Sequence, residues 1–321
     1  MSTKSKGAAL VILIIFGVTS LKAQGDSFLS YNILNPSLYN AAWVGLDNEA
    51  SVLVQLRSQW TGYKTSFDGN GGAPSTQILS MMIPVMNKFS GIGLSVANES
   101  LGPVNTLKLN MPLSYKLDFK RSQLSLGLMP GIISRTQNFN ELRFNDPSDP
   151  FNVGTKETQT LLNLGLGALY FFPNRSFVGL GINNLLQPRF DFGLEGSNNR
   201  AVANYTLNAG ISKVFGEGLE VRPNASVRTD LTSHSVDLGF IAYYQSKLWL
   251  GTSYRWSEAI VLMVGFSLIK DINLKLGYAL DVITSNSEAK EVTSHEIFVK
   301  YHLKDFTFGG KKKVKTPRFI N

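Results

Sequence analysis

The chain has 321 residues, 43% of them hydrophobic, and a mean hydropathy of +0.00, which is too polar for a bundle of membrane helices. Much of the +8 net charge sits at the two ends, and no interior basic stripe carries stacking aromatics, so we expect no nucleic-acid partner. There is no cysteine, which excludes a disulfide scaffold and a lipid anchor on cysteine.

The first 23 residues have the pattern expected of an export signal. An apolar run from Ala8 to Val18 follows Lys4 and Lys6 and precedes Leu21-Lys22-Ala23. A basic start, a short apolar core and a small residue at the end predict a signal peptide over 1–23, cleaved after Ala23. The run is too short to span a bilayer comfortably. Together with the strands described next, the leader indicates the outer membrane of a Gram-negative bacterium.

Residues 24–48 do not alternate as a strand does. Asn35-Pro36 favours a turn, because proline disfavours the helical region for the residue before it, and Tyr39 to Trp43 could form a short helix. The segment is too apolar for a loose tail, and a barrel of this size encloses a cavity. We therefore expect residues 24–48 to enter the lumen as a partial plug.

From residue 49 onward the chain alternates with a period of two. Between Asp271 and Asp281 the large apolar residues are Ile272, Leu274, Leu276, Tyr278 and Leu280. From Thr293 to Leu303, Ile297, Val299, Tyr301 and Leu303 share one face, whereas Glu296, Phe298, Lys300 and His302 lie mostly on the other. Strands of about 10 residues with one apolar face are typical of a transmembrane antiparallel β-barrel. Residues 49–303 are predicted to form it, and 304–321 a basic tail.

Fourteen strands are expected, an even number as in bacterial single-chain barrels. They lie near 49–60, 75–85, 89–99, 104–118, 121–135, 159–172, 176–184, 204–215, 218–229, 233–245, 247–256, 259–268, 271–281 and 293–302.

The connections alternate between long and short. The long ones are 61–74, 136–158, 185–203 and 282–292, and tight turns such as 86–88 and 173–175 lie between them. Outer-membrane barrels have long extracellular loops and short periplasmic turns. Because the first connection is long and the strand number is even, both termini are predicted to be periplasmic.

Three further features of the sequence refine this prediction. Aromatic residues near strand ends predict interfacial girdles, namely Tyr170, Phe171, Phe172, Tyr243, Tyr244, Trp249, Tyr254 and Trp256. Glycines inside strands, such as Gly127 and Gly167, are expected to allow curvature. The strand 259–268 is apolar on both faces, which predicts either contact with the plug or a membrane strand of poorer pattern.

Several ordered stretches resemble the type IX secretion membrane-protein family PorP/SprF. They are Ser30-Tyr31, Asn35-Pro36, Arg57-Ser58-Gln59-Trp60-Thr61-Gly62, Gly91-Ile92-Gly93-Leu94, Gly102, Leu248 to Arg255, Gly277-Tyr278, Asp281, Ser294-His295-Glu296-Ile297 and Thr316-Pro317-Arg318-Phe319. Two stretches depart from the family pattern, Ser37-Leu38-Tyr39 and Val292-Thr293.

The resemblance implies an outer-membrane barrel that works with type IX secretion components. It further implies export and surface anchoring of a large secreted protein with a C-terminal sorting domain, such as a gliding-motility adhesin, and a periplasmic partner that binds peptidoglycan. Outer-membrane lipid is the surrounding medium.

The candidate site residues suit structure or partner binding better than catalysis. His295 and Glu296 are strand neighbours, so they point to opposite faces and cannot form a dyad, and the one facing the lumen is expected in a polar network. Arg57 and Trp60 suit an interior charge network and a girdle, or else a dock for the N-terminal segment or a partner. No enzyme activity, metal site or cofactor is expected.

The remaining candidates are Asn35, Pro36 and Gly62 in the matched stretches, and the basic tail residues Lys311, Lys312, Lys313, Lys315 and Arg318. The tail is either a solvated extension or a periplasmic contact. Three functions stay open: a type IX accessory barrel, a channel for hydrophobic solutes resembling the long-chain fatty-acid transporter family, and a barrel enzyme.

Overall fold

The structure is a computed structural model that describes residues 29–30, 33–47, 49–63, 72–85, 89–142, 146, 148, 154–192, 199–268, 273–285 and 291–303. The expected signal peptide 1–23 and the basic tail 304–321 lie outside the described residues. No helix in the described ranges has the length and apolar character needed to cross a membrane.

Strands make up most of the described chain. They are β1 (Ala50–Ser58), β2 (Ser75–Pro84), β3 (Phe89–Leu101), β4 (Val104–Asn110), β5 (Leu113–Asp118), β6 (Gln123–Asn138), β7 (Lys156–Phe171), β8 (Ser176–Asn183), β9 (Arg189–Phe190), β10 (Asn199–Arg200), β11 (Asn204–Ile211), β12 (Lys213–Phe215), β13 (Leu219–Thr229), β14 (His234–Tyr244), β15 (Leu248–Arg255), β16 (Ala259–Leu268), β17 (Leu274–Ile283) and β18 (Thr293–Leu303). Three 3₁₀ helices accompany them: η1 (Pro36–Leu38), η2 (Ala41–Trp43) and η3 (Phe139–Glu141).

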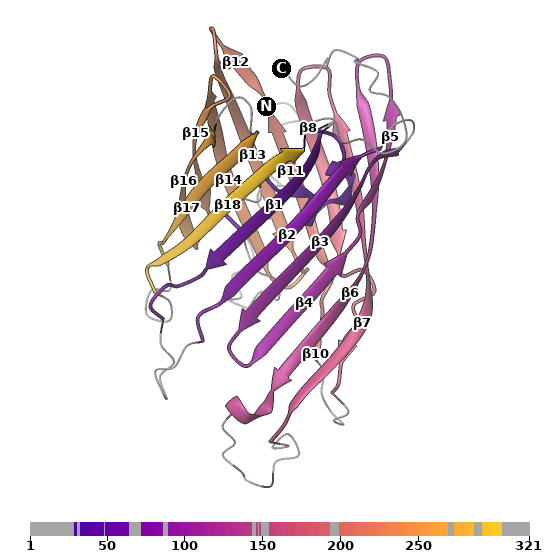
Figure 1. Cartoon of the computed structure of the whole chain (residues 1–321), viewed down its shortest axis with the longest axis vertical. Helices are drawn as coiled ribbons and strands as arrows, with labels where there is room; N and C mark the ends of the chain where they lie inside the picture. The colour runs from indigo at the N-terminus through magenta and orange to yellow at the C-terminus, as the bar shows by residue number, and fades with distance from the viewer. Residues whose placement is uncertain are drawn as a thin grey trace, which may run out of the picture.

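The described strands form a closed antiparallel barrel whose wall has fourteen strands, as predicted (Figure 1). Consecutive strands pair around the wall, and β1 pairs with β18, with Ala50 opposite Leu303. Two wall strands are interrupted. β4 and β5 follow one another around Pro112, which has no N–H for the ladder, and β11 and β12 are separated by Ser212. The strands β9 and β10 form a separate two-stranded sheet that is not part of the wall.

The two faces of the wall differ as the alternation predicted. Leu107, Leu109 and Leu162 are exposed, whereas Ser114 and Asn163 are buried on the inner face. The outer surface is therefore an apolar band suited to lipid, and the inner surface carries small and polar side chains. The tight turns such as 173–174 lie at one end of the barrel, which we call the turn end, and the long connections lie at the opposite loop end.

The predicted loop 185–203 is partly packed against the barrel. Its hairpin β9–β10 places Phe190, which is 0% exposed, against Ile133 and Ala201. Arg135 lies over the Phe190 ring at 4.6 Å. The other predicted loop, 136–158, begins and ends with residues that extend β6 to Asn138 and β7 back to Lys156. All residues of these extensions, 136–138 and 156–158, are polar, so the sequence shows no apolar alternation that would predict a strand there.

The aromatic girdle prediction is wrong for three residues. Tyr244, Tyr254 and Trp256 are exposed, but Trp249 is 2% exposed and packs in the lumen with Val261 and Met263. Phe171 and Tyr243 also face inward, where they line a cavity. Period two dictates this outcome, because the neighbours of each of the three, such as Leu248 and Leu250, take the lipid face.

The apolar inner face of β16 has a partner. Its Val261 and Met263 belong to a cluster against which Ile33 and Leu34 of the N-terminal segment pack. Of the two explanations for an apolar inner face in this strand, contact with the N-terminal segment is the one observed.

Candidate functional site

The described N-terminal residues, 29–30 and 33–47, lie against the inner face of the wall. Two inward serines donate to the segment: Ser114 Oγ to the Val44 carbonyl at 2.5 Å and Ser125 Oγ to the Ala42 carbonyl at 2.7 Å. The segment is short 3₁₀ turns rather than α-helix, and Asn40 caps η2 by accepting from the Ala42 N–H at 3.0 Å. Buried backbone groups are thus satisfied by the wall and by local turns.

Two inward glycines make room for this segment. A Cβ on Gly167 would lie 2.1 Å from Asn40 Oδ1, and one on Gly127 would lie 2.3 Å from the Ala42 nitrogen. Asn40 also donates to the backbone carbonyl of Ala168 at 3.1 Å. Close approach of the segment, and not curvature alone, therefore requires glycine at these positions.

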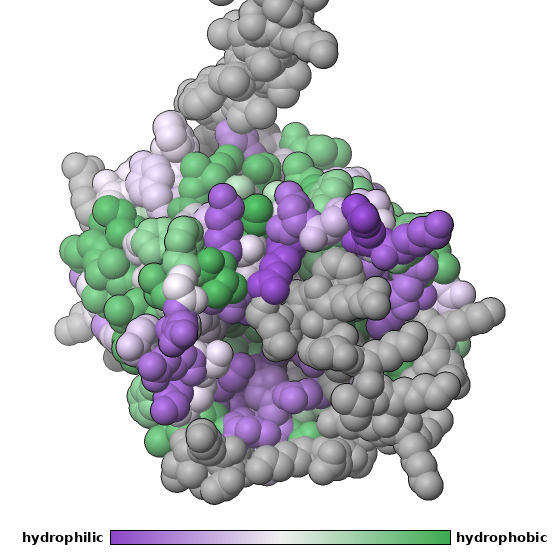
Figure 2. Space-filling model, turned by 90° about the horizontal axis from the view of Figure 1, so that it is seen from above, coloured by the Kyte–Doolittle hydropathy of each residue, from purple (hydrophilic) through white to green (hydrophobic). Residues whose placement is uncertain are grey.

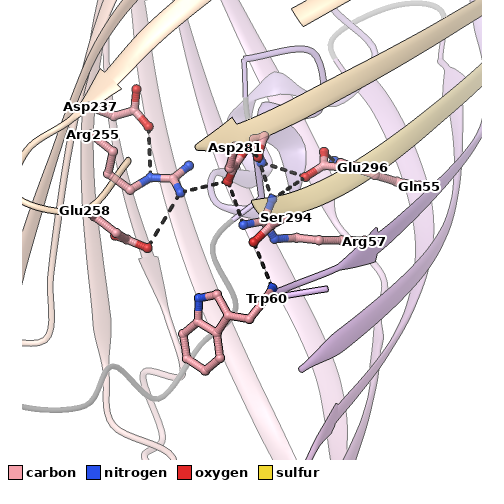
Figure 3. A network of polar contacts seen from close by, with 10 residues as sticks. Gln55, Arg57, Trp60, Asp237, Arg255, Glu258, Asp281, Ser294 and Glu296 are labelled. Carbon is pink, nitrogen blue, oxygen red and sulfur yellow. Dashed lines mark hydrogen bonds and ion pairs between the residues drawn. The ribbon is translucent and has the colours of Figure 1, made fainter. Parts of the chain in front are cut away.

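A buried ionic network holds the start of the segment near the loop end (Figure 3). Arg57 of β1 contacts Asp281 of β17 at 2.7 Å and Glu296 of β18 at 3.2 Å, and all three side chains are at most 1% exposed. Ser30 joins them: Arg57 Nη1 donates to Ser30 Oγ at 2.6 Å, and the Ser30 N–H donates to Glu296 at 2.7 Å. Ser30 Oγ also donates to Asp281. The N-terminal segment is thereby part of the charge network.

A second guanidinium extends the network along the wall. Arg255 of β15 is 0% exposed and lies 3.3 Å from Asp281, 3.4 Å from Asp237 of β14 and 3.8 Å from Glu258 (Figure 3). Asp281 therefore lies between both arginines. Taking charges out of water is costly unless each is paired, so this geometry fixes the side chains in one arrangement.

Two side-chain amides hydrogen-bond the turn of the segment to the same network. Gln55 donates to Glu296 at 2.6 Å and accepts from Asn35 at 3.2 Å. Asn35 accepts in turn from Ser37 Oγ at 3.1 Å, and Pro36 occupies the first position of η1. Asn35 is 1% exposed, so its amide is committed to holding the turn.

The predicted site residues separate into groups. Asn35, Arg57 and Glu296 are brought together, and the Trp60 N–H donates to Ser294 Oγ at 3.0 Å beside them. His295 lies on the other face, with Nδ1 2.5 Å from the Tyr278 hydroxyl.

The other predicted site residues lie apart from this network. Gly62 has a φ of +98° and a Cβ there would meet nothing within 4 Å, as in an open turn. Lys311, Lys312, Lys313, Lys315 and Arg318 lie outside the described residues.

The prediction missed Ser30, Asp237, Arg255, Glu258 and Asp281 as members of the network. A signal for most of them was present. Ser30, Arg255 and Asp281 belong to the stretches that carried the family resemblance, and those stretches converge on one place in the barrel. Arg and Asp residues at the alternate strand positions that face the lumen were the physical signal that could have identified them.

Near the turn end, an ion pair joins the last residues of the segment to the wall. Lys300 of β18 lies 3.1 Å from Asp47, and the Lys300 ammonium holds the pKa of the Asp47 carboxyl below its ordinary value. The side chain of Asp47 is 61% exposed, so this pair is far more solvated than the network around Arg57.

A cavity of about 210 Å³ remains beside the segment at the turn end. Its wall includes apolar groups, Trp43, Phe171, Phe177 and Tyr243 among them, and the charged residues Asp47, Arg175, Glu220 and Arg222. Figure 2 looks onto this end, with hydrophilic side chains across the middle and hydrophobic ones around much of the rim.

Comparison with known proteins gives one family and several barrels. The model of the family described as type IX secretion system membrane protein PorP/SprF matches residues 21–301. No curated protein matches the chain.

Solved structures with a similar chain path include Omp33 of Acinetobacter baumannii (10% identity, covering 79% of this chain and 98% of that one, TM-score 0.48). The toluene transporter TbuX of Ralstonia pickettii is 11% identical (83% and 91% covered, TM-score 0.49). The toluene transporter TodX of P. putida is 9% identical (86% and 95% covered, TM-score 0.49).

Proposed function

The chain belongs to the PorP/SprF family of type IX secretion system membrane proteins, and from this premise we propose that it supports export of one partner protein and anchors it at the cell surface. The fold and the family make it an outer-membrane barrel of type IX secretion. The partner we propose is a large secreted protein with a C-terminal sorting domain, such as a gliding adhesin.

The occupied lumen is the observation that carries this proposal. Residues 33–47 pack on the inner wall, and Ser30 is held by Arg57, Asp281 and Glu296, whose side chains are each at most 1% exposed. A barrel whose interior is held in place by buried ion pairs suits a rigid docking platform better than a wide pore. We propose that the segment acts as a partial plug.

The loop end supplies the surface for the partner. Connecting loops on a rigid scaffold are where binding residues gather. In the loop 136–158, Asp146 accepts hydrogen bonds from Ser148 N–H at 2.8 Å and Ser148 Oγ at 2.7 Å. These bonds hold the pKa of the exposed Asp146 carboxyl below its ordinary value and brace a turn, and a braced turn loses less entropy on binding.

The turn end is proposed to face the periplasm, with both termini. The tail residues Lys311, Lys312, Lys313, Lys315 and Arg318 would then offer positive charge to an acidic surface of a periplasmic partner, such as one that binds peptidoglycan. Attraction of this kind weakens as salt increases.

A channel for hydrophobic solutes is the second candidate. The apolar cavity beside the segment is the observation that favours it, since small-molecule sites are concave and mostly apolar.

A comparison of surface proteomes tests both candidates. Deleting the gene should release, degrade or retain one large secreted protein and leave most other exported proteins in place, and the wild-type gene supplied in trans should restore it. An unchanged surface proteome, with failed uptake of a hydrophobic nutrient, contradicts anchoring and supports the channel.

A further inference from the structure

The cavity at the turn end is apolar where the lumen of a barrel is usually polar. The ring of Trp43 meets Phe177 edge-on at a centroid distance of 4.9 Å and Phe171 at 5.6 Å. Phe171 and Phe177 come from the inner faces of β7 and β8, and Leu46 packs on the same cluster. Three aromatic rings thus form one wall of the cavity of about 210 Å³. Apolar walls of this kind favour an apolar occupant over water.

The rim of this cavity is cationic. Arg222 binds Glu220 through two hydrogen bonds of 2.8 and 3.1 Å, and its guanidinium lies over the Tyr243 ring at 4.7 Å. Asp47, the other acid of the lining, pairs with Lys300. Each acid is therefore matched by a cation, and Arg175 adds a further positive charge at the rim.

The wall also contains polar atoms that face no protein partner. Among the described residues, Trp43 Nε1 is buried and has no hydrogen-bond acceptor, and Asn208 Oδ1 is buried and has no donor. Both residues line the cavity. Burying a donor or an acceptor without a partner costs free energy, so the protein alone does not complete this part of the wall.

We infer that this cavity binds one single-chain amphiphile with an anionic head group, a long-chain carboxylate. The alkyl chain lies against Trp43, Phe171 and Phe177, and the carboxylate lies towards Arg175 and Arg222. Guanidinium groups bind carboxylates through charge-assisted hydrogen bonds, which are stronger than neutral ones. The inference does not depend on type IX export, because it concerns only what the turn end of the lumen holds.

Tryptophan quenching by a brominated fatty acid tests the inference. The chain has four tryptophans, and dibromostearate is added to the purified full-length mature barrel in phosphatidylcholine nanodiscs. Saturable quenching is expected in the wild type and in Trp256→Phe, whose ring is exposed, and is expected to fall strongly in Trp43→Phe, with the remainder coming from Trp249 beside Tyr243. Quenching that rises without saturation, or that survives Trp43→Phe unchanged, overturns the site.

A pair of bulky substitutions separates the cavity from the membrane. Ser226 of β13 lines the cavity and is opposite Asp237, an inward residue of the adjacent strand β14. Its neighbour Val227 is 36% exposed on the lipid face. In equilibrium dialysis with radiolabelled stearate, Ser226→Phe should weaken binding roughly tenfold, which is ~1.4 kcal/mol, and Val227→Phe should leave it unchanged. Equal binding by the two variants contradicts the inference.

The head group is tested with Arg175→Gln. This variant should bind stearate several-fold more weakly than the wild type does. Its affinity for the uncharged alcohol of the same chain length should equal that of the wild type. If the alcohol binds the wild type as tightly as the carboxylate, or if an apolar peptide binds saturably and stearate does not, the assignment to an anionic amphiphile is wrong.

Discussion

Arg57 Nη2 lies 2.7 Å from Asp281 Oδ2, although their strands are not neighbours in the wall. β18 lies between β1 and β17, so the ion pair reaches across a strand on the inside of the barrel. Ser30 of the N-terminal segment hydrogen-bonds both side chains. The pair therefore joins the wall to the segment within it.

Removing the guanidinium is expected to destabilise the barrel. Arg57→Met leaves Asp281 and Glu296 buried with less positive charge, and breaking a buried pair from one side costs about 3–5 kcal/mol. We expect the folded band on unheated gels to be lost at a lower temperature than in the wild type. Asp47→Asn, which breaks a solvated pair worth about 1 kcal/mol or less, serves as the control. Matching midpoints for Arg57→Met and the wild type would refute the expectation.

Neutralising the acids together with Arg57 should recover much of the loss. In the triple variant Arg57→Met, Asp281→Asn, Glu296→Gln, fewer uncompensated charges remain buried, and buried ion pairs are often replaceable as a set. Arg255 then keeps Asp237 and Glu258 as partners. The same gel assay measures the recovery, and a triple variant less stable than Arg57→Met alone contradicts the argument.

Deleting residues 24–48 should raise conductance in planar bilayers. These residues include the described segment that packs on the inner wall, where it hydrogen-bonds Ser125 of β6 and Gln55 of β1, and its loss opens the space between these two wall residues. The full-length protein in the same bilayers is the reference. Unchanged single-channel conductance would count against the segment as a plug.

A bulky side chain at Gly167 should displace the segment without breaking the wall. A Cβ there meets Asn40 Oδ1 at 2.1 Å, so Gly167→Val is expected to expose residues 33–47 to added protease. Ala168→Val, on the opposite face of the same strand, is the matched control. Asn40→Ala in the Gly167→Val background should restore part of the protection, and no difference between the two valine variants would contradict the close fit.

Orientation is tested with tags on intact cells. We expect a protease-cleavable tag in the loop 136–158 to be cut and one after Asn321 to be protected, because loops of outer-membrane barrels are long outside and short inside. The reverse pattern would invert the barrel and move the cavity of the turn end to the cell surface.

The alternation of apolar and polar residues was enough to predict the wall. Leu162 and Asn163 illustrate why: one is 71% exposed and the other 6%, as expected when successive side chains of a strand face lipid and lumen in turn. β1 was harder, because Leu53 faces inward with Gln55 and Arg57 while Val52 and Val54 face lipid, so both faces contain apolar residues.

The interior could not be predicted from strand patterns. Arg57, Asp281 and Ser30 are far apart in sequence, and only the closed wall brings them within hydrogen-bond distance. Phe171 and Trp249 were predicted to be girdle residues because their neighbours in the strand are also apolar. The sequence therefore does not show which of them face lipid. The path of residues 33–47 depends on the wall around it, so local sequence specifies its turns but not where it lies.

The partners of Ser30 have a consequence for assembly. Arg57 comes from the first wall strand, and Asp281 and Glu296 come from the last two, so the network needs both ends of the chain. β1 and β18 are also the strands that meet at the seam between those ends. Ser30 is synthesised before the whole wall, yet it gains its buried contacts with Asp281 and Glu296 only when the last two strands arrive. Closure of the seam and seating of the segment are therefore one cooperative step, which makes the finished interior a sign that the whole chain has been delivered.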